Sequence, residues 1–158
     1  MFRPARRKNR EISTELAKEL LAKSKRGVIA VNGDEGYPYA VPINYFYDED
    51  NDKIYFHGAR VGHKIESIKK NDKVCFTVYG NDRLEDGDWA PYVQSTVVFG
   101  RCHLIENQKE AIELVRNLAK KYYPNEDLID EEVDKYGEAV QMFEIEIEHL
   151  TGKMIHEK

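Results

Sequence analysis

Two prolines interrupt a strand-like stretch at residues 37–45, Tyr-Pro-Tyr-Ala-Val-Pro-Ile-Asn-Tyr. Proline has no backbone N–H to give to a neighbouring strand, so within a sheet it marks an edge, a bulge or a place where something else lies alongside. A flat heteroaromatic ligand fits the last description. Its ring edge needs backbone donors and acceptors and an amide, which Val41, Pro42 and Asn44 can present. Composition alone favours the simpler interpretation of an edge strand with a bulge.

A second stretch that could bind a ligand is His57-Gly58-Ala59-Arg60-Val61-Gly62-His63-Lys64. Small residues just before a helix allow a ligand to approach the backbone. The first amides of the helix and its dipole favour an anion, and Lys64 adds a cation in the first turn. A phosphate site requires these features. An ordinary glycine-rich turn with a solvated lysine explains the same residues equally well.

The remaining polar residues carry weaker signals. Gln94, Ser95 and Thr96 begin an apolar run, where hydroxyls either bind a phosphate or polyol chain or satisfy a turn. His57 and His63 lack a Cys or carboxylate partner at ligand spacing, so we expect no metal site. No Ser-His-Asp or Cys-His pattern with family spacing is present, which gives hydrolase chemistry little support.

Composition narrows the class of protein. The chain has 158 residues, 41% of them apolar, which suits one domain with one core. The formal charge of −5 lacks a basic surplus, so we expect no nucleic-acid partner. A basic arm at residues 1–12 is interpreted as a partner contact or a frayed end. Because no stretch resembles a transmembrane helix or signal peptide, we expect no membrane association and a cytoplasmic location. Cys75 and Cys102 lie in apolar runs typical of reduced, buried thiols.

Hydrophobic periodicity predicts the elements that must position these residues. Ser13 caps a first helix that Gly27 ends, and further helices are expected at 62–70 and 110–122. The expected strands are 27–32, 39–47, 53–57, 73–79, 93–105 and 140–150, with the first three forming an antiparallel meander. The loop at 80–91 carries the only tryptophan, Trp89, and we interpret it as a binding wall or dimer contact. The acidic stretch 126–134 is expected to be a short surface helix or loop without chemistry.

About six strands in hairpins with few helices predict a mainly β protein, a β-barrel with peripheral helices. A repeated βαβ order, a GxGxxG motif and a Walker loop are all absent, which argues against Rossmann and P-loop folds.

Taken in order, these segments resemble the pyridoxamine-phosphate-oxidase-like split barrels that bind flavin mononucleotide (FMN), and within them the nitroimidazole-reductase branch. The resemblance spans nearly the whole chain. It rests on residues 6–12, 36–45 and 54–59 with Gly62 and Lys64, on 73–76, on Gln94-Ser95 with Phe99-Gly100, and on 145–147 with 150–153.

This resemblance implies a homodimeric, FMN-binding split β-barrel with two FMN molecules at the subunit interface. Residues Val41, Pro42, Ile43 and Asn44 would lie against the isoalloxazine ring. His57, Gly58 and Ala59 would follow the ring and ribityl chain, while Gly62 and Lys64 would hold the phosphate. Gln94 and Ser95 would approach from the dimer-forming side. The departures of this sequence from the family pattern include the loop at 82–91, which would help to shape the substrate pocket.

The implied function is an oxidoreductase that passes electrons from NAD(P)H through FMN to a small nitroaromatic acceptor. His57 is the candidate proton donor, because an imidazole titrates near neutral pH. Three alternatives stay open: a flavin-binding carrier, store or sensor with little turnover, a barrel that binds haem in the same groove, and a structural dimer without a cofactor.

Overall fold

Eight strands form one antiparallel sheet, as the alternation of apolar and polar residues predicts. The computed structural model describes residues 1–158. The strands are β1 (Glu11–Ile12), β2 (Arg26–Asn32), β3 (Pro38–Asn44), β4 (Phe46–Asp48), β5 (Lys53–Gly58), β6 (Lys73–Arg83), β7 (Tyr92–Ile105) and β8 (Gln141–His156). In β8, Phe143 and Ile145 are fully buried while Glu146 is exposed on the opposite face. The mainly β class is confirmed.

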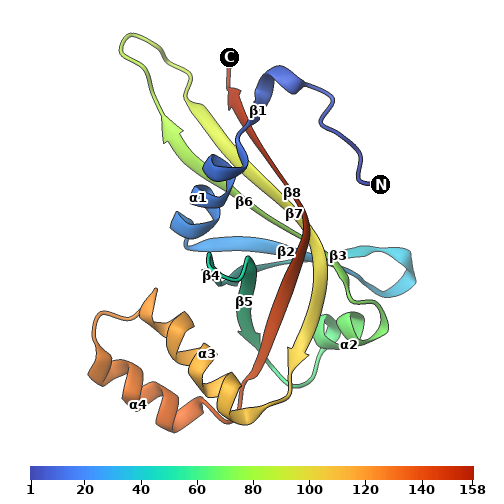
Figure 1. The fold of residues 1–158 in the computed structure, drawn as a ribbon, viewed down its shortest axis with the longest axis vertical. Coiled ribbons are helices and arrows are strands. Elements are labelled where there is room, and N and C mark those ends of the chain that lie inside the picture. The colour runs from blue at the N-terminus through green and yellow to red at the C-terminus, as the bar shows by residue number, and fades with distance from the viewer.

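The sheet curls into a split barrel. Its strand order is β3-β2-β6-β7-β8-β5-β4, and β1 pairs with β8 outside this path. The two terminal strands of that order, β3 and β4, are consecutive in the chain and are separated only by Tyr45. Figure 1 shows the long strands β7 and β8 running along the length of the molecule, with β2 lying across them. The barrel is therefore closed by the chain itself at Tyr45.

This closure corrects the expected meander, because residues 39–47 are not one strand. β3 ends at Asn44 on β2, whereas β4 pairs with β5 at the other end of the sheet. Tyr45 is fully buried, and its backbone N–H donates to the Tyr122 hydroxyl at 2.8 Å. The Tyr122 hydroxyl also lies 2.7 Å from the Tyr45 carbonyl oxygen. One side chain thus replaces the strand partner that Tyr45 lacks.

A bulge between β7 and β8 contributes to the curl. Phe99 lies opposite His149, whereas Gly100 lies opposite Ile147, so β8 carries one extra residue at this point. Bulges bend the strand and increase its local twist. A Cβ on Gly100 would collide with the Glu146 carbonyl oxygen, so only glycine allows the two strands to pack this closely.

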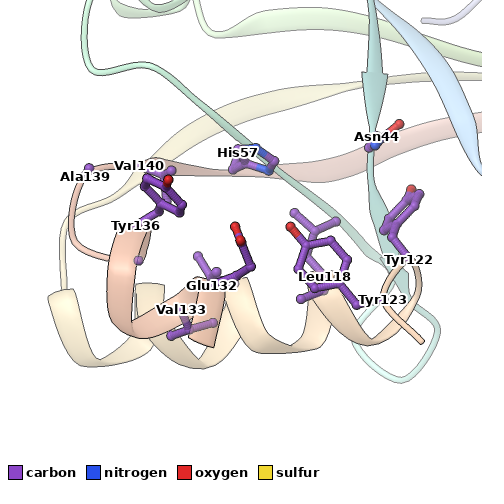
Figure 2. Close-up of a pocket in the computed structure, with 13 residues that line it drawn as sticks. Asn44, His57, Leu118, Tyr122, Tyr123, Glu132, Val133, Tyr136, Ala139 and Val140 are labelled. Atoms are coloured by element: carbon purple, nitrogen blue, oxygen red, sulfur yellow. The ribbon is translucent and has the colours of Figure 1, made fainter. Parts of the chain in front are cut away.

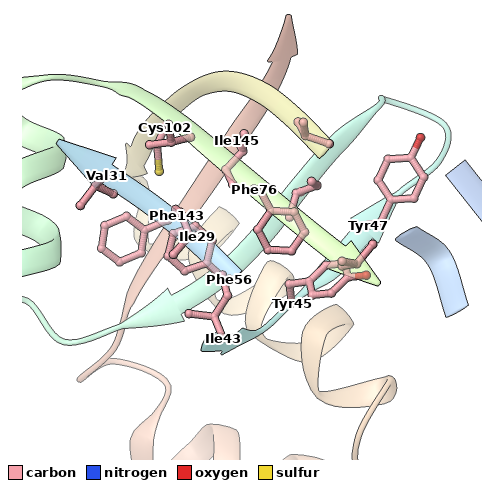
Figure 3. Close-up of a cluster of buried hydrophobic side chains, with 14 of the residues drawn as sticks. Ile29, Val31, Ile43, Tyr45, Tyr47, Phe56, Phe76, Cys102, Phe143 and Ile145 are labelled. Carbon is pink, nitrogen blue, oxygen red and sulfur yellow. The ribbon is translucent and has the colours of Figure 1, made fainter. Parts of the chain in front are cut away.

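The barrel interior is filled by a cluster of large apolar side chains (Figure 3). The Phe56 and Phe143 rings stack with their centroids 4.8 Å apart, and the Tyr45 ring meets the Phe76 ring edge-on at 4.8 Å. A side chain at Gly27 would overlap the Phe76 ring. Burial of these rings together with the aliphatic side chains around them supplies the hydrophobic stabilisation of the barrel.

Four α-helices accompany the sheet, namely α1 (Thr14–Lys23), α2 (His63–Lys70), α3 (Gln108–Lys120) and α4 (Glu126–Tyr136). Ser13 caps α1 as predicted, but the helix ends at Lys23 before Gly27 is reached. Buried Thr96 donates its hydroxyl to the Ala17 carbonyl at 2.9 Å, so this hydroxyl serves packing. No helix is both long and apolar enough to cross a membrane.

The acidic stretch 126–134 lies within a full helix. α4 is capped by Asn125 and buries Ile129 and Val133. α3 and α4 pack against each other outside one end of the barrel (Figure 1). The predicted loop at 80–91 is shorter than expected, because β6 continues to Arg83 and forms a protruding hairpin with β7. Trp89 in this hairpin loop is 77% exposed.

We expect Tyr122→Phe to lower the free energy of unfolding by about 1–3 kcal/mol, because it leaves the N–H of buried Tyr45 without an acceptor. Urea unfolding of the ligand-free chain measures the change. Tyr123→Phe is the matched control, because Tyr123 is 38% exposed and its hydroxyl forms no hydrogen bond within the protein. Equal stability of the two variants would contradict the closing role of Tyr122.

Candidate functional site

The proline-containing strand β3 is an edge strand, so the edge part of the sequence interpretation is confirmed, but no bulge interrupts its register with β2. It pairs with β2 alone, with Pro42 opposite Val28 and Pro38 opposite Asn32. Ile43 is buried toward the core, while Pro42 and Asn44 are exposed. The unpaired side of β3 therefore leaves backbone and amide groups available to a ligand.

The end of β5 brings His57 and Gly58 to the same region. Phe56 is buried in the core and His57, the next residue, is exposed on the outer face. A Cβ on Gly58 would lie 3.2 Å from Lys64 Nζ and 3.2 Å from the Phe143 ring. Glycine at this position therefore gives the Lys64 side chain room to pass across the end of the strand.

Helix α2 begins beside this strand end. Its first turn follows Gly62, whose φ of +121° is a conformation that side-chain-bearing residues rarely adopt. No side chain caps the helix, so its first N–H groups and the positive end of its dipole are available to an anion. His63 stacks on the Tyr39 ring at 4.2 Å and is within 3.3 Å of the Asp34 N–H, which anchors the first residue of the helix.

Lys64 is a half-buried cation without a carboxylate partner. Its Nζ lies 5.1 Å from the centroid of the Phe56 ring and 5.7 Å from that of Phe143, and no Asp or Glu forms an ion pair with it. Burial lowers the pKa of Lys64 below its ordinary value of 10.5. A buried charge without a partner is costly, and an anion bound at this point would offset that cost.

The pKa of His57 is also lowered. Although the side chain keeps exposed surface, the protein packed around it displaces part of its water, and this desolvation is the larger cause of the lowered pKa. The positive charge of Lys64 is the smaller cause. The lowered pKa keeps the imidazole neutral at pH 7. The neutral ring can donate one hydrogen bond and accept another.

These elements enclose a pocket of about 420 Å³. Six residues singled out from the sequence line it, and they are Val41, Pro42, Ile43, Asn44, His57 and Lys64. Gly58 lies beside Lys64, whereas Ala59 and Gly62 are exposed and do not line the pocket. Their part in ligand binding stays a prediction.

Gln94 and Ser95 do not reach this pocket within one chain. Gln94 lines a different pocket and accepts a hydrogen bond from Asn81 at 2.9 Å. Ser95 lies opposite Tyr79 on β6 and Lys153 on β8. The single chain therefore separates these two residues from His57 and Lys64.

Arg26 lines the pocket and was missed from the sequence. The β2–β3 register pairs Arg26 with Asn44. Its position could have been predicted by pairing the residues of β2 and β3 one by one outward from the hairpin turn at residues 33–36. Its guanidinium adds a second positive charge to the pocket, which favours an anionic ligand.

A second pocket of about 400 Å³ adjoins the first and shares Asn44 and His57 with it. The remaining lining comes from α3, α4 and the residues that follow them (Figure 2). Arg60, just after β5, connects that strand end to the segment after α4, because its Nη2 donates to the Glu138 carbonyl at 2.9 Å. Sequence reasoning missed this pocket, since its helices were predicted without a position relative to the sheet.

The first pocket fits a phosphate-bearing planar group. The unpartnered Lys64 and the uncapped start of α2 suit a phosphate, and Arg26 adds positive charge. The free side of β3 and the Asn44 amide suit the edge of a heteroaromatic ring.

Several solved structures share the fold. A protein assigned to 5-nitroimidazole antibiotic resistance in Bacteroides thetaiotaomicron superposes with a TM-score of 0.76 at 22% identity, over 92% of this chain and 87% of that chain. An FAD-binding protein of Mesorhizobium loti superposes with a TM-score of 0.64 at 22% identity, over 92% of this chain and 97% of that chain. The flavocytochrome Anf3 of Azotobacter vinelandii superposes with a TM-score of 0.73 at 18% identity, over 96% of this chain and 72% of that chain. At these identities the likeness shows the fold alone.

Comparison with curated proteins finds no significant match. A family model does match, and it is described as pyridoxamine 5'-phosphate oxidase. The match runs from residue 13 to residue 154, which includes strands β2 to β7 and all but the last two residues of β8. Both pockets described above lie within it. The chain belongs to the pyridoxamine 5'-phosphate oxidase family.

Proposed function

We propose that this protein is an FMN-dependent oxidoreductase that passes electrons from NAD(P)H to a small nitroaromatic acceptor. The observation that carries the proposal is Lys64, a half-buried cation that has no carboxylate partner and stands at an uncapped helix start. A flavin phosphate supplies the missing anion. Membership of the family and the flavin-binding or nitroimidazole-resistance names of similar structures support the same choice.

When bound, FMN would supply the redox chemistry that links the nicotinamide to the acceptor. The residues of this chain bind and orient it. Lys64 and the first amides of α2 hold the phosphate, while β3 and Asn44 fix the ring edge. His57 is shared by both pockets and is therefore positioned to donate a proton to an acceptor bound beside the ring.

The proposal includes a homodimer in which Gln94 and Ser95 of one chain complete the pocket of the other. Neither residue reaches the pocket of its own chain. Tyr79 and Trp89, on the same β6–β7 hairpin, are 76% and 77% exposed, and such aromatic side chains are common in subunit contacts.

The absorption spectrum of the purified protein is the first test. We expect oxidised-flavin bands, release of FMN at about one per chain, bleaching of the bands by NAD(P)H and the mass of two chains in solution. A Soret band would indicate haem instead. A colourless protein that ignores added FMN would contradict the proposal, and bound FMN that no nicotinamide reduces would favour a carrier or sensor.

Lys64→Ala should weaken FMN binding by about 1.5–3 kcal/mol, because it removes a charge-assisted contact to the phosphate. Quenching of flavin fluorescence measures the dissociation constant. Lys69→Ala is the control, since Lys69 lies on the same helix but its exposed side chain pairs with Glu66 at 3.5 Å. Unchanged affinity in Lys64→Ala would show that the phosphate binds elsewhere.

The pH profile of nitroreduction tests His57. If its protonated form donates the proton, turnover falls as pH rises through a pKa that lies below 6.5, the direction set by burial. Burial persists when phosphate neutralises Lys64, so the direction holds in the loaded protein. His57→Gln should remove this limb of the profile while FMN content stays normal. The same limb in both proteins would exclude His57 as the donor.

A further inference from the structure

The residues that line the second pocket indicate what kind of molecule it would bind. Nine of its thirteen lining residues are hydrophobic, which suits a flat apolar molecule. Its volume of about 400 Å³ lies near the small end of the range for ligand pockets, so a molecule of one or two rings is the expected size. Tyr122, Tyr123 and Tyr136 add aromatic surface for stacking.

Glu132 is the only carboxylate in this lining, and no Lys or Arg shares the pocket. The other acidic side chains of α4 are exposed, whereas Glu132 is half-buried. Figure 2 shows its carboxylate rising from α4 on the side that faces His57. Asp130 on the same helix pairs with Arg116, but Glu132 has no ion-pair or hydrogen-bond partner.

A half-buried carboxylate that has no partner in the protein is free to pair with a cation that enters the pocket. The same charge repels aromatic molecules that carry a carboxylate. The basic pocket around Lys64 and Arg26 and the acidic pocket at Glu132 are thus complementary in sign and meet at Asn44 and His57.

We propose that this pocket binds the electron acceptor and that Glu132 selects acceptors that carry a cationic amine. The inference rests on the proposed function, because it assigns the acceptor of the same flavin site. The aromatic part of the molecule lies among the tyrosines beside His57. Its ammonium group meets the Glu132 carboxylate.

Isothermal titration of the FMN-loaded protein with three matched nitroaromatics tests this selection. The probes are 4-nitrobenzylamine, 4-nitrobenzyl alcohol and 4-nitrobenzoate at pH 7.5. We expect the amine to bind at least tenfold more tightly than the alcohol, and the benzoate most weakly. In Glu132→Gln, the amine and the alcohol should bind within about twofold of each other.

Glu131→Gln is the matched control, because Glu131 is an exposed neighbour on the same helix and its loss should leave the preference intact. Equal binding of the amine and the alcohol to the unaltered protein, no binding of any probe, or a preference that survives in Glu132→Gln would overturn the proposal. Calorimetry needs no turnover, and flavin content and NAD(P)H reduction are measured separately. A failure of the proposed oxidoreductase is therefore distinguished from a failure of the amine selection.

Discussion

The fold depends on how the chain passes from one end of its sheet to the other at Tyr45. Residues on either side of this position pair with different strands, so the backbone of Tyr45 has no strand partner although it is buried. A buried peptide group without hydrogen bonds would cost more than a typical hydrogen bond contributes. The Tyr122 hydroxyl, just beyond the end of α3, accepts from the Tyr45 N–H and lies within hydrogen-bond distance of the Tyr45 carbonyl oxygen, which also accepts from Lys121. A helix distant in sequence therefore seals the barrel.

The same closure assembles the candidate site. The crossing places the end of β3 near β5, and the polar residue just before the crossing, Asn44, lines both pockets. Lys64 reaches the region over Gly58 from the start of α2. Lys121, next to Tyr122, donates to the Tyr45 carbonyl at 3.2 Å, and burial lowers its pKa to about 8. The residues at the end of α3 thus hold the chain at Tyr45, where the barrel closes, and also form one wall of the second pocket.

Two pockets of opposite charge meet at His57, so the two sides of the site favour different ligands. The basic side suits a phosphate, and the side formed by α3 and α4 suits an apolar molecule next to one carboxylate. Because an anion is favoured on one side and repelled on the other, charge alone separates the two kinds of ligand. The helices α3 and α4 thus form the apolar side of the site in addition to packing at the end of the barrel.

The resemblance to a known family identified six residues that line one pocket. From its own patterns the sequence determined most strand and helix types, the mainly β class and the edge character of β3. These depend on short-range rules: apolar periodicity, the missing N–H of Pro42, and glycine next to a helix start. Tertiary structure decided the rest. The break at Tyr45 depends on a hydroxyl 77 residues away, and Arg26 joins the site only through the β2–β3 register. Glu132 looked like one more solvated charge, since only the packing of α4 on α3 sets which acidic side chain faces the pocket. Such long-range contacts depend on packing and chain closure, which no local pattern of residues records.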